Sequence, residues 1–236
     1  MRAVILAGGR GTRLLPYTTV LPKPLLPIGD MPILELLIRQ LRQSGIQQIT
    51  LAVGYLAQLI MAYFEDGKKL EVEIEYSFEQ EPLGTAGPIA LLNNLDESFL
   101  VMNGDLLTDL DFEAMCADHR NQNAIATIGI SQHDVKIPLG VIETNSNRRV
   151  TSYTEKPVFH YQASMGIYVF EPTILKYIPK GERLDLPDLV DKVIRSNQQV
   201  NAYLHNGFWL DIGSPAEYQH GLEEFANLKE RLLKQR

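Results

Sequence analysis

Hydrophobic residues in the first half of the chain form short apolar runs that alternate with segments of helical spacing. In residues 33–41 the apolar positions recur every three to four residues, and Gly45 ends the pattern, as glycine commonly ends a helix. In chain order, the runs and helical segments are residues 3–6, 33–41, 49–53, 56–64, 72–76, 85–92 and 99–102. This alternation predicts βαβ units around a mainly parallel, buried sheet.

The pattern changes at about residue 124, where apolar runs follow one another with few helices between them. These runs are residues 125–130, 140–143, 150–154 and 166–170. They predict an antiparallel or mixed extension of the sheet. Residues 186–194 and 215–233 regain helical spacing, and the last helix carries one apolar stripe of Leu222, Phe225, Leu228 and Leu232. We expect this helix to pack on the body or on a second subunit.

Length and composition predict a single large domain. The chain has 236 residues, of which 45% are hydrophobic and 22% charged, and it shows no internal repeat or linker. Gly, Pro or a charge interrupts every apolar run before the roughly 20 residues that a membrane-spanning helix needs. Glycines and arginines at 8–13 end the first run, so we interpret that run as a strand and not as an export signal. We therefore expect no membrane partner.

Charge and cysteine content narrow the classes of function further. The net charge is −7, and Lys and Arg are scattered, which argues against a nucleic-acid surface. A single cysteine, Cys116, excludes an intramolecular disulfide and fits a reducing, cytoplasmic location. We expect Cys116 to be a partly buried side chain of a helix.

A glycine-rich loop follows the first predicted strand, where an open α/β sheet binds ligands. Residues 6–14 read LAGGRGTRL, and glycines allow a phosphate to approach the backbone N–H groups. Leu14 stands where the dinucleotide fingerprint needs its third glycine, and no Gly-Lys-Ser/Thr follows to form a P-loop. Lys23 lies between two prolines, which stiffen its segment, so it loses less freedom when it meets an anion.

These residues resemble the N-terminal signature of the sugar-phosphate nucleotidylyltransferases. The signature is the run at 6–14 with Pro16, Thr18 and the LPKPL sequence at 21–25. The resemblance continues in register through residues 82–87, 103–105, 155–157, 166–168 and 209–213. It implies a Rossmann-like, three-layer α/β/α fold of the GT-A-like type with a mixed central sheet. It also implies one nucleotidyltransferase domain over 1–236, with a nucleotide-binding part at about 1–123, a sugar-phosphate-binding part at about 124–214 and a C-terminal helix at 215–236.

The resemblance implies transfer of a nucleotidyl group from a nucleoside triphosphate to a sugar 1-phosphate, with release of pyrophosphate. In the family, aspartates that match Asp105 and Asp211 hold a Mg²⁺ ion. Asp105 follows an apolar run and therefore lies at the carboxyl end of a buried strand, although an aspartate there could also be a cap or turn residue. Because the sugar-phosphate nucleophile is already ionised, no general base is needed, and positioning and charge neutralisation carry the catalysis.

Further roles follow residue by residue from the resemblance. Arg13 is expected to grip the leaving phosphates and Lys23 to contact the reacting phosphoryl group, so that Arg13, Lys23 and Asp105 are the catalytic residues. The sugar phosphate is expected to contact Gly140, Glu155 and Lys156. The nucleotide is expected to contact Leu6, Ala7, Gly8, Gly9, Gly11, Thr12, Arg13, Glu79, Gly84 and Thr85.

The choice of base depends on Glu79, which matches the family residue that faces the base edge. A carboxylate only accepts hydrogen bonds, and guanine offers two adjacent donors, so Glu79 favours GTP. The segment PLGTAG at 82–87 is also most similar to mannose-1-phosphate guanylyltransferases. A shift of one residue would put Gln80 on the base and reverse this argument.

Several alternatives to GTP with mannose 1-phosphate stay open. These are UTP or dTTP with glucose 1-phosphate, GTP with a heptose phosphate, a catalytically silent nucleotide-sugar sensor, and a glycosyltransferase. A homo-oligomer is also open, since the last helix could pack on a second subunit.

Overall fold

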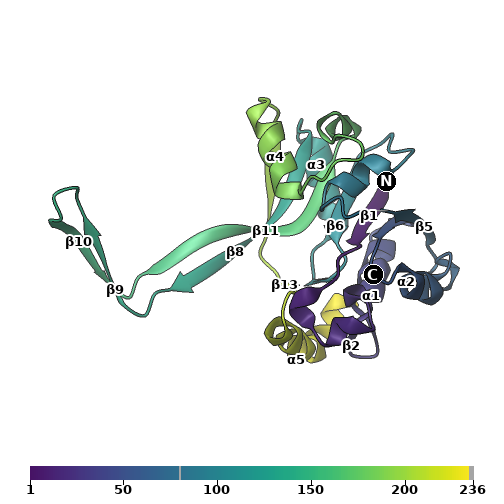
Figure 1. Ribbon diagram of the computed structural model, residues 1–236, viewed down its shortest axis with the longest axis horizontal. Coiled ribbons are helices and arrows are strands. Elements are labelled where there is room, and N and C mark those ends of the chain that lie inside the picture. The colour runs from purple at the N-terminus through teal and green to yellow at the C-terminus, as the bar shows by residue number, and fades with distance from the viewer. Residues whose placement is uncertain (80, 234–236) are drawn as a thin grey trace.

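A seven-stranded mixed sheet forms the centre of the computed structural model, which describes residues 1–79 and 81–233 (Figure 1). Its strand order is β12-β8-β11-β6-β1-β4-β5. The strands are β1 (Arg2–Ala7), β4 (Gln48–Val53), β5 (Glu73–Phe78), β6 (Phe99–Asn103), β8 (Ala126–Lys136), β11 (Val158–Phe170) and β12 (Val200–His205). The half of the sheet that contains β1, β4, β5 and β6 is parallel, and β11 runs antiparallel to both β6 and β8. The predicted mixed sheet is confirmed.

Successive residues of the central strands face opposite sides of the sheet, and both sides are buried. Val4 of β1 packs in a cluster that includes Leu189 of α4, whereas Ile5 packs in a cluster that includes Leu37 of α1 and Ile60 of α2. Helices therefore cover both faces, which confirms the three-layer fold. The helices are α1 (Ile33–Gln43), α2 (Ala57–Phe64), α3 (Phe112–Asn121), α4 (Leu186–Arg195) and α5 (Pro215–Leu232).

The last helix, α5, packs on the body of the same chain. Its residues Tyr218, Phe225 and Leu232 are buried in a third cluster with Leu14 and Ile33. Leu222 and Leu228 pack against this cluster from the side. Of the two partners expected for this helix, the structure shows the body.

Two short ladders lie beside the central sheet. β7 (Leu106–Thr108) pairs antiparallel with β13 (Trp209–Asp211), and β2 (Pro27–Ile28) pairs with β3 (Met31–Pro32). The β7–β13 ladder brings the last part of the chain next to the end of β6.

The segment at residues 85–92 departs from the expected α-helical spacing. It forms a 3₁₀ helix over Gly87–Leu91, with Pro88 in its first turn. The backbone N–H groups of Ala86 and Gly87 donate to the carbonyl of Leu184, at 2.9 and 3.1 Å. These two N–H groups therefore bind a distant loop and are not part of an α-helix.

Residues 132–163 form a long arm that leaves the sheet at its carboxyl edge (Figure 1). The outer parts of β8 and β11 make its stem, and β9 (Gly140–Thr144) and β10 (Val150–Glu155) make a separate two-stranded ladder at its end. The expectation that residues 140–143 and 150–154 extend the sheet is therefore wrong. These residues do form strands, but the two strands pair with each other and not with the central sheet.

Two further findings concern general expectations. Within the described residues, no helix combines the length and the apolar character needed to cross a membrane. Cys116 is buried in α3, as expected, and burial raises the pKa of its thiol to about 11.

Candidate functional site

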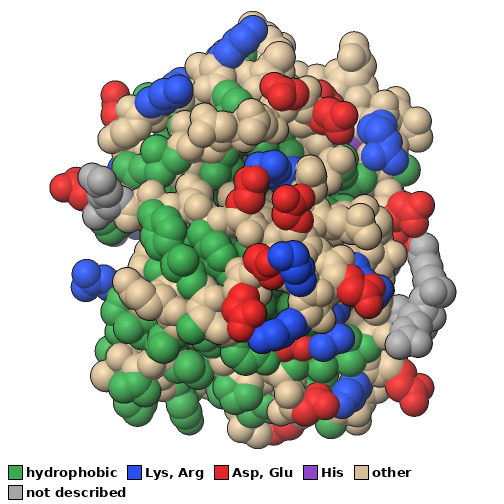
Figure 2. Space-filling view, turned by 90° about the vertical axis from the view of Figure 1, so that its right-hand side faces the viewer, with side chains coloured by type: hydrophobic (Ala, Val, Ile, Leu, Met, Phe, Trp, Pro, Cys, Tyr) green, Lys and Arg blue, Asp and Glu red, His purple; other side chains and the backbone are tan. Residues whose placement is uncertain are grey.

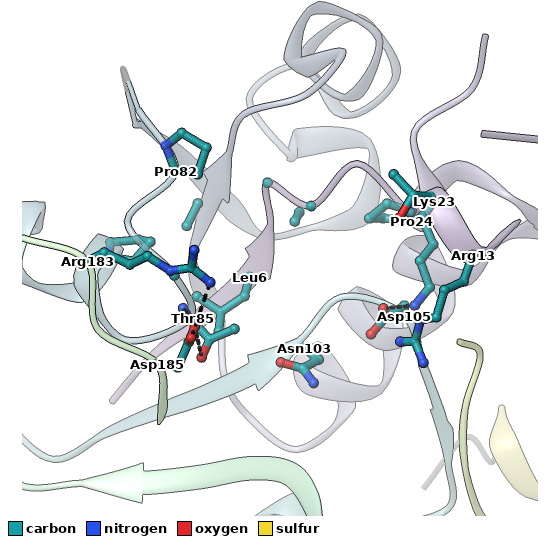
Figure 3. Close-up of a pocket in the computed structure, with 18 residues that line it drawn as sticks. Leu6, Arg13, Lys23, Pro24, Pro82, Thr85, Asn103, Asp105, Arg183 and Asp185 are labelled. Carbon is teal, nitrogen blue, oxygen red and sulfur yellow. Dashed lines mark hydrogen bonds and ion pairs between the residues drawn. The ribbon is translucent and has the colours of Figure 1, made fainter. Parts of the chain in front are cut away.

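A cavity of about 440 Å³ opens at the carboxyl ends of β1 and β6 (Figure 3). These strands are parallel neighbours, with Leu6 opposite Asn103, so the loops that follow them meet at one edge of the sheet. Eleven of the expected site residues line the cavity: Leu6, Ala7, Gly8, Gly9, Gly11, Thr12, Arg13, Lys23, Gly84, Thr85 and Asp105.

The glycine loop bends into the cavity at Gly11, whose φ of +61° lies in the left-handed region. A Cβ at this position would lie 2.9 Å from Thr18 Cγ2. The Thr18 hydroxyl donates a 2.8 Å hydrogen bond to the Gly11 carbonyl and holds the turn. The loop therefore needs a glycine at position 11, both for its conformation and for the close approach of Thr18.

Lys23 is buried, and its ammonium group pairs with two carboxylates. It forms an ion pair with Asp105, and its Nζ lies 3.8 Å from Asp211 Oδ1. Pro22 is extended and precedes a 3₁₀ turn over Lys23–Leu25, which fixes the backbone that carries the lysine. Figure 3 shows Lys23, Arg13 and Asp105 together on one side of the cavity.

The two carboxylates come together through the β7–β13 ladder. Asp211 is the last residue of β13 and is opposite Leu106, which follows Asp105 directly. The Ile212 N–H also donates to the Asp105 carbonyl at 3.1 Å. Burial, and then the negative charge of Asp105, raise the pKa of Asp211 above its usual range.

Both aspartates have an oxygen whose hydrogen-bonding capacity is unused. Within the part of the chain that the structure describes, Oδ1 of Asp105 and Oδ1 of Asp211 are buried and have no hydrogen-bond partner. Buried acceptors of this kind normally have a partner. Asp105 lines the cavity, whereas Asp211 lines a second cavity of about 290 Å³ that shares Thr85 and Asn103 with the first. Two neighbouring hard oxygen ligands suit Mg²⁺, which takes one or two protein carboxylates and fills its other positions with phosphate and water. No group of three or more His, Cys, Asp or Glu side chains suited to a metal occurs among the described residues.

The opposite wall of the cavity includes residues that sequence reasoning missed. Arg183 and Asp185 lie there beside Thr85 (Figure 3). Asp185 Oδ1 accepts from the Thr85 N–H at 3.0 Å, and Thr85 Oγ1 accepts from the Leu186 N–H at 2.7 Å. Asn103 lies between the two walls (Figure 3) and was also not among the expected site residues. The only sequence signal for Asp185 is its place at the cap of α4, two residues before Pro187.

Glu79 lies beside the glycine loop. A Cβ on Gly8 would be 2.6 Å from Glu79 Oε1, so Gly8 leaves room for this carboxylate. Its other oxygen, Oε2, accepts from the Leu83 N–H at 3.0 Å. Gln80, the alternative base-facing residue, lies outside the described residues.

The three residues expected to contact the sugar phosphate lie on the arm. Gly140 begins β9, and Glu155 ends β10 opposite it in the same ladder. Lys156 follows, with its Nζ 3.9 Å from Glu155 Oε1. The structure brings these three residues together but places them apart from the residues that line the cavity.

Comparison with known proteins identifies the family. Residues 2–227 match the family model described as nucleotidyl transferase. A UTP–glucose-1-phosphate uridylyltransferase from Synechocystis is 37% identical over 92% of this chain and 61% of its own length. A mannose-1-phosphate guanylyltransferase catalytic subunit beta from Dictyostelium discoideum is 34% identical over 96% of this chain and 65% of its own length. The chain thus spans less than two thirds of these relatives.

Solved structures share the fold. A glucose-1-phosphate thymidylyltransferase from Bacillus anthracis, described as putative and in complex with a sucrose, superposes with a TM-score of 0.76 and 23% identity, covering 95% of this chain and 94% of its own. HddC from Yersinia pseudotuberculosis, in complex with GMP-PN, superposes with a TM-score of 0.72 and 25% identity, covering 95% of this chain and 99% of its own.

Proposed function

Since this chain belongs to the nucleotidyl transferase family, we propose that it transfers a nucleotidyl group from a nucleoside triphosphate to a sugar 1-phosphate and releases pyrophosphate. The observation that carries the proposal is the cation of Lys23 between Asp105 and Asp211, beside the glycine loop that lines the cavity. Such a constellation suits the transfer of a phosphoryl group, which needs aligned charges and not an acid–base pair.

The proposed reaction is an in-line displacement at the α-phosphorus. An oxygen of the sugar phosphate forms a bond to this phosphorus, and the bond to the bridging oxygen of the β-phosphate breaks, so that the electron pair leaves with pyrophosphate. The glycine loop positions the triphosphate through its backbone, Lys23 faces the reacting phosphoryl group, and Arg13 binds the leaving phosphates. These contacts act by orientation and by neutralising charge.

We propose Asp105 and Asp211 as the ligands of a Mg²⁺ ion. Their buried oxygens without a hydrogen-bond partner and the raised pKa of Asp211 support this, because a bound cation would satisfy both oxygens and favour the ionised carboxylate. When bound, the ion supplies positive charge for the phosphate oxygens.

As the two substrates we propose GTP and mannose 1-phosphate. Glu79 supports guanine, since one carboxylate oxygen faces the glycine loop while the other is fixed by Leu83. The name of the Dictyostelium relative points the same way. The name of the Synechocystis relative supports the alternative of UTP with glucose 1-phosphate. We also propose a cytoplasmic location, which the single free and buried cysteine supports.

The test is pyrophosphate release across ATP, CTP, GTP, UTP and dTTP with mannose 1-phosphate, glucose 1-phosphate and a heptose 1-phosphate. We expect Mg²⁺-dependent release that chelation abolishes and that is largest with GTP and mannose 1-phosphate. Asp105→Asn, which keeps the shape of the side chain, is the control for contaminating activity. A protein that binds nucleotides but releases no pyrophosphate with any pair would be a sensor, and the proposal would fail.

A further inference from the structure

The arm is a two-stranded ladder over most of its length. β12 pairs with β8 only as far as Ser131, and β6 pairs with β11 only from Ile167 onward. Between these points and the tip, each strand of the arm has only the other strand as a neighbour in the sheet. Two-stranded ladders are marginally stable in water unless something packs on them.

Apolar and aromatic side chains nevertheless line the arm, and they are exposed. They are Val135, Leu139, Ile142, Val150, Tyr153, Val158, Phe159 and Tyr161, each at least 45% exposed. Val135, Phe159 and Tyr161 share one face of the β8–β11 ladder, because Phe159 is opposite Val135 and Tyr161 lies two residues further along β11. Exposed apolar side chains gathered on so narrow a ladder mark an interaction surface. Figure 1 shows the arm pointing away from the body, so the body of the same chain does not cover this surface.

The root of the arm is held in this direction. The indole N–H of Trp209 donates a 2.9 Å hydrogen bond to the Met165 carbonyl, and the ring of His133 packs edge-on against the same indole, with centroids 5.7 Å apart. Beyond this root the β8–β11 ladder continues in unbroken register from Ser164 to Val158. At about 3.3 Å per residue, Lys156 lies roughly 25 Å along the arm from Ser164. It cannot turn back to its own cavity without breaking the ladder.

The junction between the two ladders of the arm is built like part of a binding site. Lys156 has a φ of +47°, which turns the chain at the end of β10. The Tyr153 hydroxyl donates a 3.0 Å hydrogen bond to Glu155 Oε2 and orients this carboxylate. A Cβ on Gly140 would clash with Tyr153 Oη, so glycine leaves the space that the hydroxyl occupies.

The arm and the body also differ in charge. Residues 132–163 contain four basic and three acidic side chains, whereas the rest of the chain contains 18 basic and 26 acidic ones. Two of the basic residues, Arg148 and Arg149, lie at the turn that forms the tip. A slightly basic arm therefore complements the acidic body of a second copy.

We propose that two copies of this chain exchange arms, and that each arm places Glu155 and Lys156 at the cavity of the other copy. Each active site would then consist of the glycine loop, Lys23 and Asp105 from one chain and the sugar-phosphate contacts from its partner. The exposed apolar row is the surface that the partner's body covers. This inference rests on the proposed function, because it assigns Glu155 and Lys156 to the same sugar-phosphate site.

Heterodimers with two affinity tags separate exchange from a site within one chain. In the first heterodimer, one chain carries Asp105→Asn and the other Lys156→Ala. Exchange creates one intact site out of two, because the intact arm of the first chain meets the intact cavity of the second. With the sugar phosphate well below its wild-type KM, where the higher KM of Lys156→Ala lowers the rate, we expect about half of the wild-type activity, well above that of either homodimer. A site within one chain would give no gain over the two homodimers and would overturn the proposal.

The second heterodimer reverses this pattern and is the matched control. One chain carries both Asp105→Asn and Lys156→Ala, and the other is wild type. Exchange impairs both sites, because each contains one altered part, so at the same low sugar-phosphate concentration we expect little activity. A site within one chain would leave the wild-type chain active and give about half of the wild-type rate. Activity in this heterodimer therefore contradicts exchange.

The mass of the protein in solution tests exchange without any assay of activity. Light scattering should give a dimer for the wild type, and Phe159→Ser with Tyr161→Ser, which removes two apolar contacts of the arm, should shift the mass toward a monomer. Arg120→Ser on α3, outside the arm, is the control and should stay dimeric. A monomeric wild type would overturn the exchange while leaving the proposed reaction intact. A dimer that releases no pyrophosphate would overturn the reaction instead.

Discussion

One ammonium group serves two carboxylates in this protein, since Lys23 pairs with Asp105 while its Nζ lies 3.8 Å from Asp211 Oδ1. Before substrates bind, the lysine offsets the repulsion between the two aspartates. During the proposed transfer it faces the phosphoryl group at the same point. Lys23, Asp105 and Asp211 thus stabilise the folded site through their ion pairs, and the same three residues are proposed to take part in the transfer.

Asp211→Asn should make the fold more stable and the enzyme inactive. Burial and Asp105 raise the pKa of Asp211, so the folded protein binds this proton more tightly than the unfolded chain. The wild type therefore loses stability relative to the variant as the pH rises from the ordinary aspartate pKa through the raised one. Thermal unfolding without Mg²⁺, from acidic to neutral pH, should show a Tm difference that grows in favour of the variant.

The same variant should lose about a hundredfold or more of its Mg²⁺-dependent turnover. Near-normal turnover in a folded Asp211→Asn protein, or a Tm difference that does not change with pH, would contradict the paired-carboxylate site. Asp109→Asn, at an aspartate bound by Arg231 and His205 away from the cavity, is a control for general effects of removing a charge.

Lys23→Ala should reduce kcat far more than it changes the KM for the sugar phosphate, because the lysine is assigned to the reacting phosphoryl group. It should also cost stability on the order of 3 kcal/mol, since it leaves two nearby carboxylates without their cation. The double variant Lys23→Ala with Asp211→Asn should recover part of this loss. Denaturant unfolding of the three variants and the wild type forms the cycle, and strictly additive losses would argue against the shared ion pair.

Lys156→Ala should mainly raise the KM for the sugar phosphate, by about 10- to 100-fold, which is the range expected for a lost hydrogen bond from a charged donor. Arg148→Ala at the tip of the arm removes a positive charge of the same kind and should change this KM little. Steady-state kinetics with each substrate varied in turn would separate the two. An unchanged sugar-phosphate KM in Lys156→Ala would remove the residue from the site.

Glu79→Gln should narrow the preference for GTP over dTTP. The carboxylate can accept from the guanine donors, whereas it opposes a pyrimidine carbonyl, a mismatch that costs about 1–3 kcal/mol or roughly ten- to a hundredfold in kcat/KM. Glutamine keeps an oxygen for the Leu83 N–H and restores a donor. The comparison of kcat/KM for both nucleotides in the two proteins is the measurement. A wild type that prefers dTTP would show that Glu79 does not read the base.

Gly11→Ala and Gly9→Ala should differ in their effect on the fold. Gly11 has a φ of +61° and lies against Thr18, whereas a Cβ on Gly9 would meet no atom within 4 Å. Alanine at position 11 should cost about 1–2 kcal/mol and lower the Tm by a few degrees, while alanine at position 9 should change the Tm little. Equal shifts in the two variants would contradict the assigned turn.

The buried half of the fold could be predicted because parallel strands that are covered on both faces are continuous apolar runs. The position of Asp105 follows from the same signal, since the end of such a run is the edge where ligands bind. Arg183 and Asp185 could not be predicted in this way. They lie in a loop without apolar periodicity, and only the tertiary contacts of Asp185 with Thr85 bring them to the cavity.

The arm could not be predicted from the sequence for a different physical reason. The short apolar segments at 140–143 and 150–154 indicate strands, but the pattern does not say which strands they pair with. An extension of the central sheet and a separate ladder are both consistent with these two segments. Only the register of β9 on β10 distinguishes the two.

The hydrogen bond from Ile212 to the Asp105 carbonyl has a consequence for how the protein is made. Asp211 follows Asp105 by 106 residues, so a chain that emerges from the ribosome exposes the glycine loop, Lys23 and Asp105 long before their last partner is synthesised. During that interval Lys23 has one carboxylate instead of two, and the β7 strand has no β13 to pair with. The nascent chain thus gains its full set of charges, and any affinity for a triphosphate that depends on them, only after Asp211 has been synthesised.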